Sequence, residues 1–367
     1  MNIASMDTDG KAQNGGPTAN VVSFLYDVPS WYPSFDFIGA LAIAESCRKL
    51  WYPQSEGLEV IVVTGKSPPT HGLDFQGVKF ESSYEDPDDH YRQRLHKVVL
   101  PQADLVPSVK SVTVFDTKLG QKPSSLGRQY IYPDGVDVDH LDLEPMVALS
   151  PRARLMFAVG AATDIRVVEN SKVALNDARA YAKRLTGTDR PLVMTLRANK
   201  FSGDRARDNS ESYLEIAERL AERHPVVVIP DTTDVPGGIN TRVPVAYEAA
   251  MCVRLRSALY EVARANFCGN SGPALLVQFN KNCAYYHSDL TSGAYTKEYW
   301  DGQWLAASWF LETGLFDRSG RALKRLEVNK NGPNFYAAEA LHQVVDLGAL
   351  TYEKAERFLA YLARWGR

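Results

Sequence analysis

The sequence lacks several features that would assign it directly to a class of protein. Its 367 residues include only four cysteines, and no two of them form a C-x-x-C pair. This scarcity and spacing argue against a disulfide framework or a zinc site, and they indicate buried thiols in a reducing compartment. No apolar run approaches the roughly 20 residues that span a bilayer. We therefore expect a cytoplasmic protein without a transmembrane segment.

Several catalytic signatures are also missing. The chain contains no G-x-S-x-G, no Walker loop and no H-E-x-x-H, and no G-x-G-x-x-G follows the first predicted strand. The last absence argues against a conventional dinucleotide oxidoreductase. The net charge of −3 gives no electrostatic reason to expect nucleic acid as a partner.

The chain instead alternates short apolar runs with helical stretches, which is typical of α/β proteins with parallel sheets. Strands are expected at 21–26, 58–64, 98–100, 112–115, 130–132, 192–196, 226–229, 266–268 and 283–286. Helices are expected at 37–50, 171–185, 213–221, 246–265, 335–345 and 352–365. The length suggests two domains. We place a disordered tail at 1–20, a first α/β half at 21–168, a second at 169–334 and closing helices at 335–367.

The most informative segment is the loop Gly269–Pro273, where an apolar strand ends and a helix-like run begins. Ser271 is expected to cap the helix, Gly272 to let the backbone approach an anion, and Pro273 to take the first helical position. The start of a helix presents unpaired N–H groups and a partial positive charge, which suit a phosphate. A capped turn that binds nothing is the alternative.

Polar residues follow the other predicted strands of the second half. They are Arg197, Lys200, Arg205 and Arg207 after 192–196, Asp231 and Thr232 after 226–229, and residues 287–291 after 283–286. In a parallel sheet these positions would share one edge with the loop. The cations could neutralise a diphosphate leaving group, and Asp231 could accept a hydrogen bond from a ribose hydroxyl or a base edge. Alternatively, Arg197 and Arg207 lie in solvated loops, paired with neighbouring acids.

The first half carries its candidates after its first strand. Asp36 lies at the strand-to-helix turn, where a carboxylate could act as general base on a sugar hydroxyl. The alternative role is an N-cap for the helix that follows, and the two roles are compatible. Trp31 and Tyr32 could offer a flat apolar surface to a sugar ring, or they could simply pack within the loop.

These blocks resemble the GT-B glycosyltransferases, in particular the bacterial heptosyltransferase-like group. Residues 34–41 resemble the Gly-Asp turn of that group, with Phe35 in place of the glycine. Asn270-Ser271-Gly272-Pro273 is similar to its Asp-Ser/Thr-Gly-Pro/Leu phosphate loop, although Asn270 replaces the aspartate and Leu275 stands where a histidine usually follows. Residues 207–210 resemble the arginine loop of fucosyltransferase-like members.

The resemblance implies two Rossmann-like domains facing a central cleft, with the closing helices packed back on the N-terminal domain. It implies metal-independent transfer of a sugar from a nucleotide-sugar to a glycan or glycoconjugate, with Asp36 as the catalytic base and Trp31 and Tyr32 on the acceptor. The donor-binding residues would be Arg197, Lys200, Arg207, Asp231, Asn270, Ser271, Gly272 and Pro273. A nucleotide-sugar 2-epimerase and a non-catalytic nucleotide- or glycan-binding protein remain as alternatives.

Overall fold

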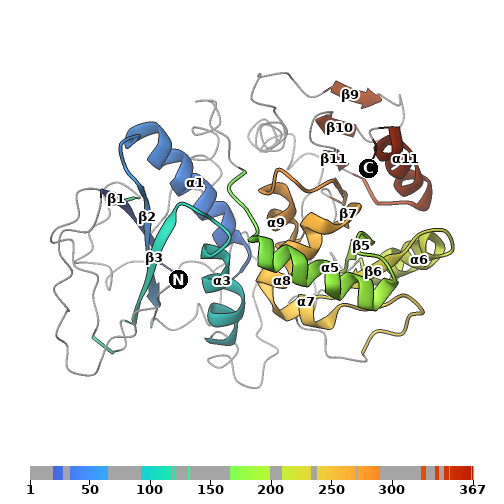
Figure 1. Ribbon diagram of the computed structural model, residues 1–367, viewed down its shortest axis with the longest axis horizontal. Helices are drawn as coiled ribbons and strands as arrows, with labels where there is room; N and C mark the ends of the chain where they lie inside the picture. Colours follow the sequence, from blue (N-terminus) through green and yellow to red (C-terminus); the bar gives the residue numbers. More distant parts are fainter. Residues whose placement is uncertain are drawn as a thin grey trace, which may run out of the picture. The chain divides into compact units, whose positions relative to one another are not determined.

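The structure is a computed structural model that forms two compact units, one ending at Val167 and the other beginning at Val168. Each unit has its own β-sheet (Figure 1). The structure describes residues 20–27, 34–64, 92–116, 119–120, 131–132, 166–198, 209–232, 238–269, 271–289, 324–327, 335–338, 343–346, 348–364 and 366.

The first unit is built on a parallel sheet in the order β3-β2-β1-β4. Its strands are β1 (Val21–Asp27), β2 (Gly57–Thr64), β3 (Val109–Asp116) and β4 (Ile131–Tyr132). Nearly every residue of β2 is buried. A run of valine and isoleucine suits such a strand, because its side chains are covered on both faces of the sheet. The predicted parallel α/β pattern is confirmed in this unit.

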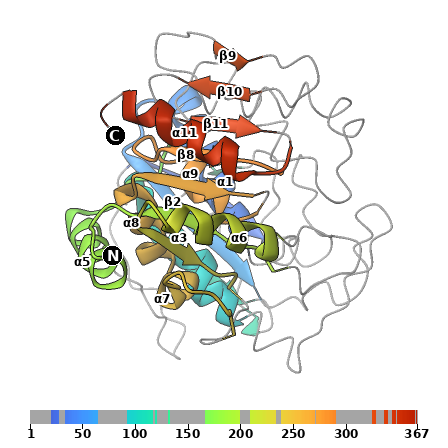
Figure 2. The same cartoon turned by 90° about the vertical axis from the view of Figure 1, so that its right-hand side faces the viewer.

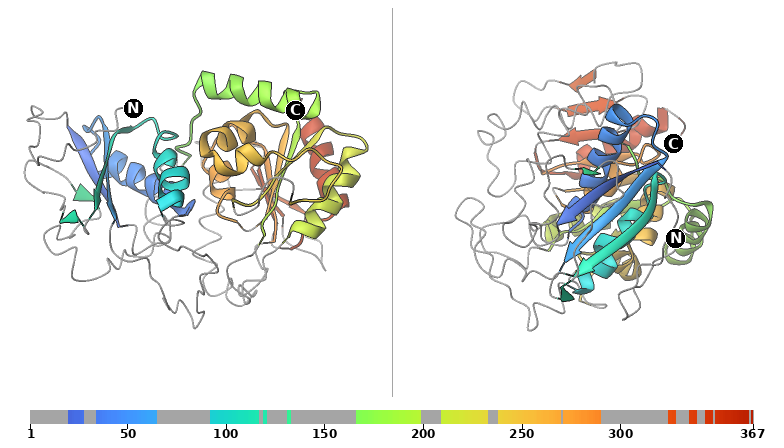
Figure 3. Two further views of the ribbon diagram at one scale, coloured as in Figure 1. Left: turned by 90° about the horizontal axis from the view of Figure 1, so that it is seen from below. Right: turned by 90° about the vertical axis from the view of Figure 1, so that its left-hand side faces the viewer.

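Helices α1 (Asp36–Trp51) and α3 (Leu100–Ala103) lie on the same side of this sheet (Figure 3). A π-helical turn, η2 (Leu95–Val99), leads into α3, so the strand expected at 98–100 was wrong. The apolar residues there are buried at helical spacing, and so short an apolar run does not by itself distinguish a strand from a helix.

The buried side chain of Gln102 on α3 fixes the start of α1. Its Oε1 accepts a hydrogen bond from Ile38 N at 2.8 Å, and its Nε2 donates to Ser34 O at 3.1 Å and to Val98 O at 2.8 Å. The first turn of a helix has backbone N–H groups without helical partners, and Gln102 supplies an acceptor for one of them. The backbone at Asp36 is therefore held from both sides.

The second unit contains a larger sheet in the order β6-β5-β7-β8-β11-β10-β9. The first five strands of this order are parallel, and β10 is antiparallel to both of its neighbours. Figure 2 shows β8, β11, β10 and β9 following one another across the sheet. The strands are β5 (Leu192–Thr195), β6 (Val226–Ile229), β7 (Ala265–Cys268), β8 (Tyr285–His287), β9 (Lys324–Glu327), β10 (Phe335–Ala338) and β11 (Gln343–Asp346).

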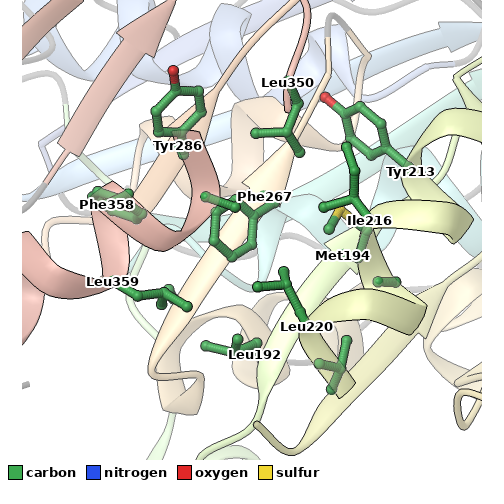
Figure 4. Packing of buried hydrophobic residues seen from close by; sticks show 14 of the residues in the cluster. Leu192, Met194, Tyr213, Ile216, Leu220, Phe267, Tyr286, Leu350, Phe358 and Leu359 are labelled. Atoms are coloured by element: carbon green, nitrogen blue, oxygen red, sulfur yellow. The ribbon is translucent and has the colours of Figure 1, made fainter. Parts of the chain in front are cut away.

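Helices cover both faces of the second sheet (Figure 3). Helices α6 (Ser210–Ala221) and α11 (Tyr352–Arg364) lie on one face, and α8 (Val253–Val262) and α9 (Ala274–Gln278) lie on the other. Because side chains alternate along a strand, each strand contributes to both layers. The layer under α6 and α11 is an apolar core (Figure 4), and its members include Leu192, Met194, Ile216, Leu220, Phe267, Tyr286, Phe358 and Leu359.

The C-terminal segment differs from the sequence prediction in two respects. Residues 335–345, expected as a helix, contain strands β10 and β11. Helix α11 was expected to pack on the N-terminal domain, but its buried face lies in the core of the second unit. The ring of Phe358 meets those of Phe267 and Tyr286 edge-on, with centroids 5.9 and 5.7 Å apart. Aromatic pairs in this geometry are stabilising.

The helix expected over 246–265 is divided into α7 (Tyr247–Met251) and α8. The break falls at Cys252, whose backbone is extended, with φ −114° and ψ 100°. Cys47, Cys268 and Cys283 are buried as expected, but Cys252 is exposed. Its thiol lies at the break and not on the buried side of a helix.

Helix α5 (Lys172–Thr186) begins and ends as its sequence predicts. Ser171 Oγ accepts a hydrogen bond from Ala174 N at 3.1 Å, and Gly187 ends the helix with φ +80°. Both features are common at helix termini. A hydroxyl at the N-cap accepts a hydrogen bond from a free backbone N–H, and glycine at the C-terminus tolerates the left-handed region. Over the described ranges, no helix has the length and apolar character needed to cross a bilayer.

Candidate functional site

The carboxyl ends of five neighbouring strands meet at one edge of the second sheet. The order β6-β5-β7-β8-β11 is parallel throughout, so the segments that follow these strands lie side by side. Ligands of open α/β sheets bind at this edge. The described residues that follow these strands are Arg197 after β5, Asp231 and Thr232 after β6, Gly269 and Ser271–Pro273 after β7, Ser288 and Asp289 after β8, and Gly348 after β11.

Arg197 is held against the start of α6 by its own backbone. Its N–H donates to Asn209 Oδ1 at 2.8 Å, and its carbonyl accepts from Asn209 N and Ser210 Oγ, both at 3.2 Å. Asn209 takes the predicted N-cap position, but its side chain makes no capping bond within the helix. The asparagine instead fixes the backbone just after the carboxyl end of β5, which we call the β5 exit. The Arg197 side chain therefore extends from a constrained backbone.

The loop after β7 differs in detail from its prediction. Pro273, with φ −57°, is the N-cap residue of α9, and Ser271 makes no side-chain cap. Three successive backbone bonds link Ala274 N to Ser271 O, Leu275 N to Gly272 O and Leu276 N to Pro273 O, at 3.0–3.1 Å. This i to i+3 pattern is that of a tight helical turn. Because α9 has five residues, few peptide dipoles align in it, and the expected electrostatic pull of a helix start is correspondingly small.

The surroundings of Gly269 leave no room for a side chain at this position. A Cβ added there would lie 2.5 Å from Asn209 Nδ2, 3.2 Å from Tyr213 OH and 3.6 Å from Asp289 Oδ2. Side chains from the first turn of α6 and from the segment after β8 therefore converge on this backbone. The sequence interpretation gave a role to Gly272 and none to Gly269 individually.

Tyr213, Ser288 and Asp289 form a buried polar group beside Gly269. Tyr213 OH donates to Asp289 Oδ2 at 2.7 Å and lies 2.6 Å from Ser288 Oγ, which in turn lies 3.1 Å from Asp289 Oδ2. Asp289 has φ +60°, the left-handed region that non-glycine residues seldom adopt. Burial raises the pKa of Asp289, and burial together with the Asp289 charge raises the pKa of Tyr213. The sequence interpretation counted Tyr213 only as an apolar residue of its helix.

A second buried carboxylate supports this group from β11. Asp346 accepts from Tyr286 OH at 2.5 Å, from Lys354 Nζ at 2.7 Å and from Gly348 N at 3.0 Å. Gly348 O then accepts from Asp289 N at 2.9 Å, which ties the β8 exit to the β11 exit. Burial and the nearby Asp346 charge raise the pKa of Tyr286. No sequence motif identified Asp346 or Lys354, because their partners come from distant segments.

A buried arginine lies behind the β6 exit. Arg256 on α8 is fully buried, and its guanidinium donates to Pro230 O at 2.7 Å and to Ala249 O at 3.0 Å. Pro230 immediately precedes Asp231, whose Oδ1 accepts from Thr232 Oγ1 at 3.1 Å. Arg256 thus fixes the corner that presents Asp231. The sequence offered no signal for it, since arginine on a helix is usually exposed.

His287 ends β8 and packs with α9 on the opposite face of the sheet from Tyr213. Its Nδ1 lies 2.6 Å from Gln278 Nε2, and both side chains are buried. Burial lowers the pKa of His287 to about 4, and a hydrogen bond between the ring and the Gly269 backbone partly offsets that shift. The ring is therefore neutral at physiological pH. The sequence placed His287 among the residues after this strand and made it a candidate only for the alternative epimerase reaction.

The structure brings five of the predicted site residues to one edge of one sheet. They are Arg197, Asp231, Ser271, Gly272 and Pro273. Asp36 is the first residue of α1, and Phe35 takes the N-cap position that the alternative interpretation gave to Asp36; only the backbone of Asp36 is described. The remaining predicted residues lie outside the described residues, and they are Trp31, Tyr32, Lys200, Arg207 and Asn270.

A shallow pocket of about 290 Å³ lies near the amino ends of the strands of the second unit, and it contains none of the predicted site residues. Its lining residues include Arg179, Arg190, Glu261 and Asn282. The Glu261 carboxylate is already engaged by three asparagine amides at 2.7–2.9 Å. Within the part of the chain that the structure describes, no group of three or more histidine, cysteine or acidic side chains is placed to hold a metal ion.

Comparison with known proteins gives only remote likenesses. No protein-family model matches the chain, and no curated protein matches it. The glycosyl transferase family 9 structure from Veillonella parvula is 12% identical, with a TM-score of 0.40, over 73% of this chain and 80% of that chain. The structure of E. coli ADP-heptose LPS heptosyltransferase II is 11% identical, with a TM-score of 0.42, over 95% and 100% of the two chains. Values this low do not assign the chain to a family.

Proposed function

We propose that this protein is a glycosyltransferase that moves a sugar from a nucleotide-sugar donor to a hydroxyl of a glycan or glycoconjugate. The observation that carries the proposal is the convergence of a cation, a glycine- and serine-bearing loop and a part-buried acid on one edge of a parallel sheet. The cation and the loop suit a diphosphate, and the acid suits a ribose hydroxyl or a base edge. The sequence resemblance to GT-B enzymes supports the same conclusion.

On the donor side, Arg197 would neutralise charge on the diphosphate as the bond to the sugar breaks. Ser271 and Gly272 would offer a hydroxyl and a backbone amide to the same group, with Asn270 and Pro273 shaping the loop. Asp231 would accept a hydrogen bond from a ribose hydroxyl or a base edge. Lys200 and Arg207 would add positive charge from the segment that joins β5 to α6.

On the acceptor side, Asp36 would act as general base. The acceptor oxygen forms a bond to the anomeric carbon of the sugar while its proton passes to the Asp36 carboxylate. The bond from that carbon to the diphosphate oxygen breaks, and the nucleoside diphosphate leaves with the electron pair. Trp31 and Tyr32 would hold the acceptor sugar, and the reaction as written needs no metal ion.

The alternative epimerase reaction is less well supported. Such an enzyme needs acid and base groups around the sugar, and His287 was one of its few candidates. His287 is 5% exposed, with a pKa near 4, so the ring is poorly placed to exchange protons with a substrate at neutral pH. A non-catalytic nucleotide-binding protein would use the same edge of the sheet without turnover.

The test is release of nucleoside diphosphate from a panel of nucleotide-sugars, with and without glycan acceptors. A transferase releases it and also forms a new glycoside, and an epimerase interconverts sugars instead. Thermal stabilisation without turnover would identify a binding protein, since a ligand of the folded state raises its melting temperature. Failure of the whole panel both to stabilise the protein and to turn over would refute the proposal.

Two variants assign roles within that assay. Asp36→Asn should lower turnover by about 10²–10⁴-fold, the usual contribution of a general base, with donor affinity within a few fold. Arg197→Ala should weaken nucleoside diphosphate binding, whereas Arg190→Ala should not. The two arginines flank the same strand, so Arg190 is a matched control at the opposite edge of the sheet. Equal calorimetric affinities for the two arginine variants would remove Arg197 from the site.

A further inference from the structure

The helix that carries the proposed general base begins without a cap from its own sequence. Asp36 is the first residue of α1, and Phe35 takes the N-cap position. Serine, threonine, aspartate and asparagine are preferred there, because their side chains accept hydrogen bonds from the first N–H groups of the helix. A phenylalanine side chain has no polar atom with which to do so. The first turn of α1 therefore finds a side-chain acceptor elsewhere in the unit.

Gln102, on α3, provides that acceptor. Its Oε1 accepts from Ile38 N at 2.8 Å, a shorter contact than the 3.2 Å between the same nitrogen and Phe35 O. Its Nε2 donates to Ser34 O at 3.1 Å. Ser34 lies two residues before Asp36, and Ile38 lies two residues after it. One side chain therefore holds the backbone on both sides of the proposed base.

The orientation of the Gln102 amide is determined by its partners. Its oxygen faces a backbone N–H, and its nitrogen faces two carbonyl oxygens, those of Ser34 and Val98. A reversed amide would place nitrogen against N–H and oxygen against both carbonyls, so all three hydrogen bonds would be lost. The side chain is fully buried, and both of its N–H donors are used within the unit. Its partners therefore call for an acceptor and donors on one side chain.

The position of this backbone matters for proton transfer. A general base must lie within hydrogen-bond distance of the proton that it removes. An aspartate side chain is short, so the position of its backbone limits where its carboxylate can lie. A misplacement of about 1 Å at a catalytic group can lower the rate by about 10²-fold. Loss of the Gln102 bonds would release the turn on both sides of Asp36.

We propose that Gln102 is a positioning residue for the general base: it holds the backbone on both sides of Asp36 and thereby sets where the carboxylate meets the acceptor hydroxyl. This inference rests on the proposed function, in which Asp36 is the base. Because Gln102 is fully buried, it acts through Asp36 and not on the substrate.

Gln102→Met keeps a long side chain in the buried position and removes its hydrogen bonds. We expect kcat, measured with the same nucleotide-sugar panel, to fall by about 10–100-fold. Nucleoside diphosphate affinity should be unchanged, because the proposed donor-binding residues belong to the second unit. Ser46→Ala is the control, since it removes a buried hydrogen bond farther along α1, from Ser46 Oγ to Ala42 O at 2.8 Å, and should leave kcat unchanged. Thermal denaturation sets an assay temperature at which every variant is folded.

Amide hydrogen exchange provides a measurement that does not depend on activity. The N–H of Ile38 should exchange faster in Gln102→Met than in wild type, because its 2.8 Å hydrogen bond is lost. Ser46→Ala should leave that exchange rate unchanged. Equal exchange at Ile38 in Gln102→Met and wild type would show that Gln102 does not hold this turn.

A double-mutant cycle with Asp36→Asn separates positioning from a general loss of structure. If Gln102 acts through Asp36, Gln102→Met lowers turnover only while the carboxylate is present. The double variant should therefore be no slower than Asp36→Asn alone. An equal fold-loss in the two backgrounds would show that Gln102 has only a structural role, and it would overturn the inference.

Failure of this inference is distinguishable from failure of the proposed function. Wild-type kcat in Gln102→Met, together with a large loss in Asp36→Asn, would refute the positioning role and leave the proposed function standing. Unchanged turnover in Asp36→Asn would remove both residues from the mechanism. If wild type turned over no nucleotide-sugar of the panel, the proposed function and this inference would both be wrong.

Discussion

The two faces of the second sheet differ in how many polar side chains they bury. The face under α6 and α11 is an apolar core, in which Phe267 and Tyr286 pack against Phe358. The face under α8 and α9 buries polar side chains from the same strands, namely Thr195, Asn266, Cys268 and His287. Neighbouring residues of one strand, such as Asn266 and Phe267, thus contribute to different kinds of interior.

The two faces also differ in how many of their buried polar atoms have hydrogen-bond partners. On the apolar face, the hydroxyls of Tyr213 and Tyr286 both donate to carboxylates. On the polar face, Asn266 Oδ1 and Gln278 Oε1 are buried without hydrogen-bond partners among the described residues. Apolar burial stabilises without regard to direction, whereas buried polar atoms need specific partners. The second face therefore holds its strands in specific geometries.

Phe267→Ala should produce the largest effect on stability. Phe267 is fully buried, and removing its ring would leave a cavity between β7 and α11. The expected loss in the free energy of unfolding is about 3–5 kcal/mol, measured by urea denaturation. Phe267→Leu, which keeps much of the volume, should cost far less. Similar losses for the two variants would show that this face is not closely packed.

Acidification should destabilise the protein through the polar face. The folded state holds the pKa of His287 near 4, below the ordinary value of 6.5, so between these pH values the unfolded chain binds a proton that the folded chain does not. The contribution of His287 is complete above pH 6.5 and is lost as the pH falls toward 4. Its total is about 3 kcal/mol, since one pKa unit is worth about 1.4 kcal/mol.

The measurement is urea denaturation at several pH values between 7 and 4, for wild type and for His287→Gln. The variant keeps a polar side chain but has no titrating ring. Its unfolding free energy should therefore fall less steeply than that of wild type over this range. Parallel curves would mean that His287 titrates normally, contrary to its burial.

Asn266→Ala tests the hydrogen-bonding side of the same comparison. Asn266 Nδ2 donates to Tyr260 O at 2.8 Å and to Ala284 O at 3.0 Å, which joins β7 to α8 and to the start of β8. The substitution removes both bonds inside the protein, and we expect a loss of about 1–3 kcal/mol in chemical denaturation. Asn266→Val should cost about the same despite its added apolar area. Recovery of stability in the valine variant would mean that the polar layer is not specific.

The smallest effect is expected at Thr195, whose hydroxyl lies 3.0 Å from Tyr260 OH. Thr195→Val keeps the shape and removes this hydrogen bond together with the weak one from Cys268 Sγ at 3.7 Å, so the loss should be about 1 kcal/mol. Thr195→Ser keeps the hydroxyl and serves as the matched control. A valine variant as stable as wild type would mean that the Tyr260 hydroxyl is satisfied without Thr195.

The sequence by itself determined the alternation of strands and helices and which residues follow the strands of the second half. Apolar runs identified β1, β2, β5, β6 and β8 because a buried parallel strand has a local signature. Strand ends in a parallel sheet share an edge, so Arg197, Asp231 and the Gly269–Pro273 loop could be grouped before their positions were seen. That rule applies within one sheet, so it does not relate Asp36, which belongs to the other unit, to these residues.

Tertiary structure decided which residues support that edge and where helices begin and end. Residues 335–345 became strands and 98–100 became helical, since short apolar runs fit either state and the neighbouring elements select between them. Tyr213 and Arg256 gained their roles from partners far away in the sequence, and Gln278 and Lys354 from partners on a neighbouring element. Burial sets the cost of a polar side chain, and burial depends on the whole packed structure, so no local pattern could identify them.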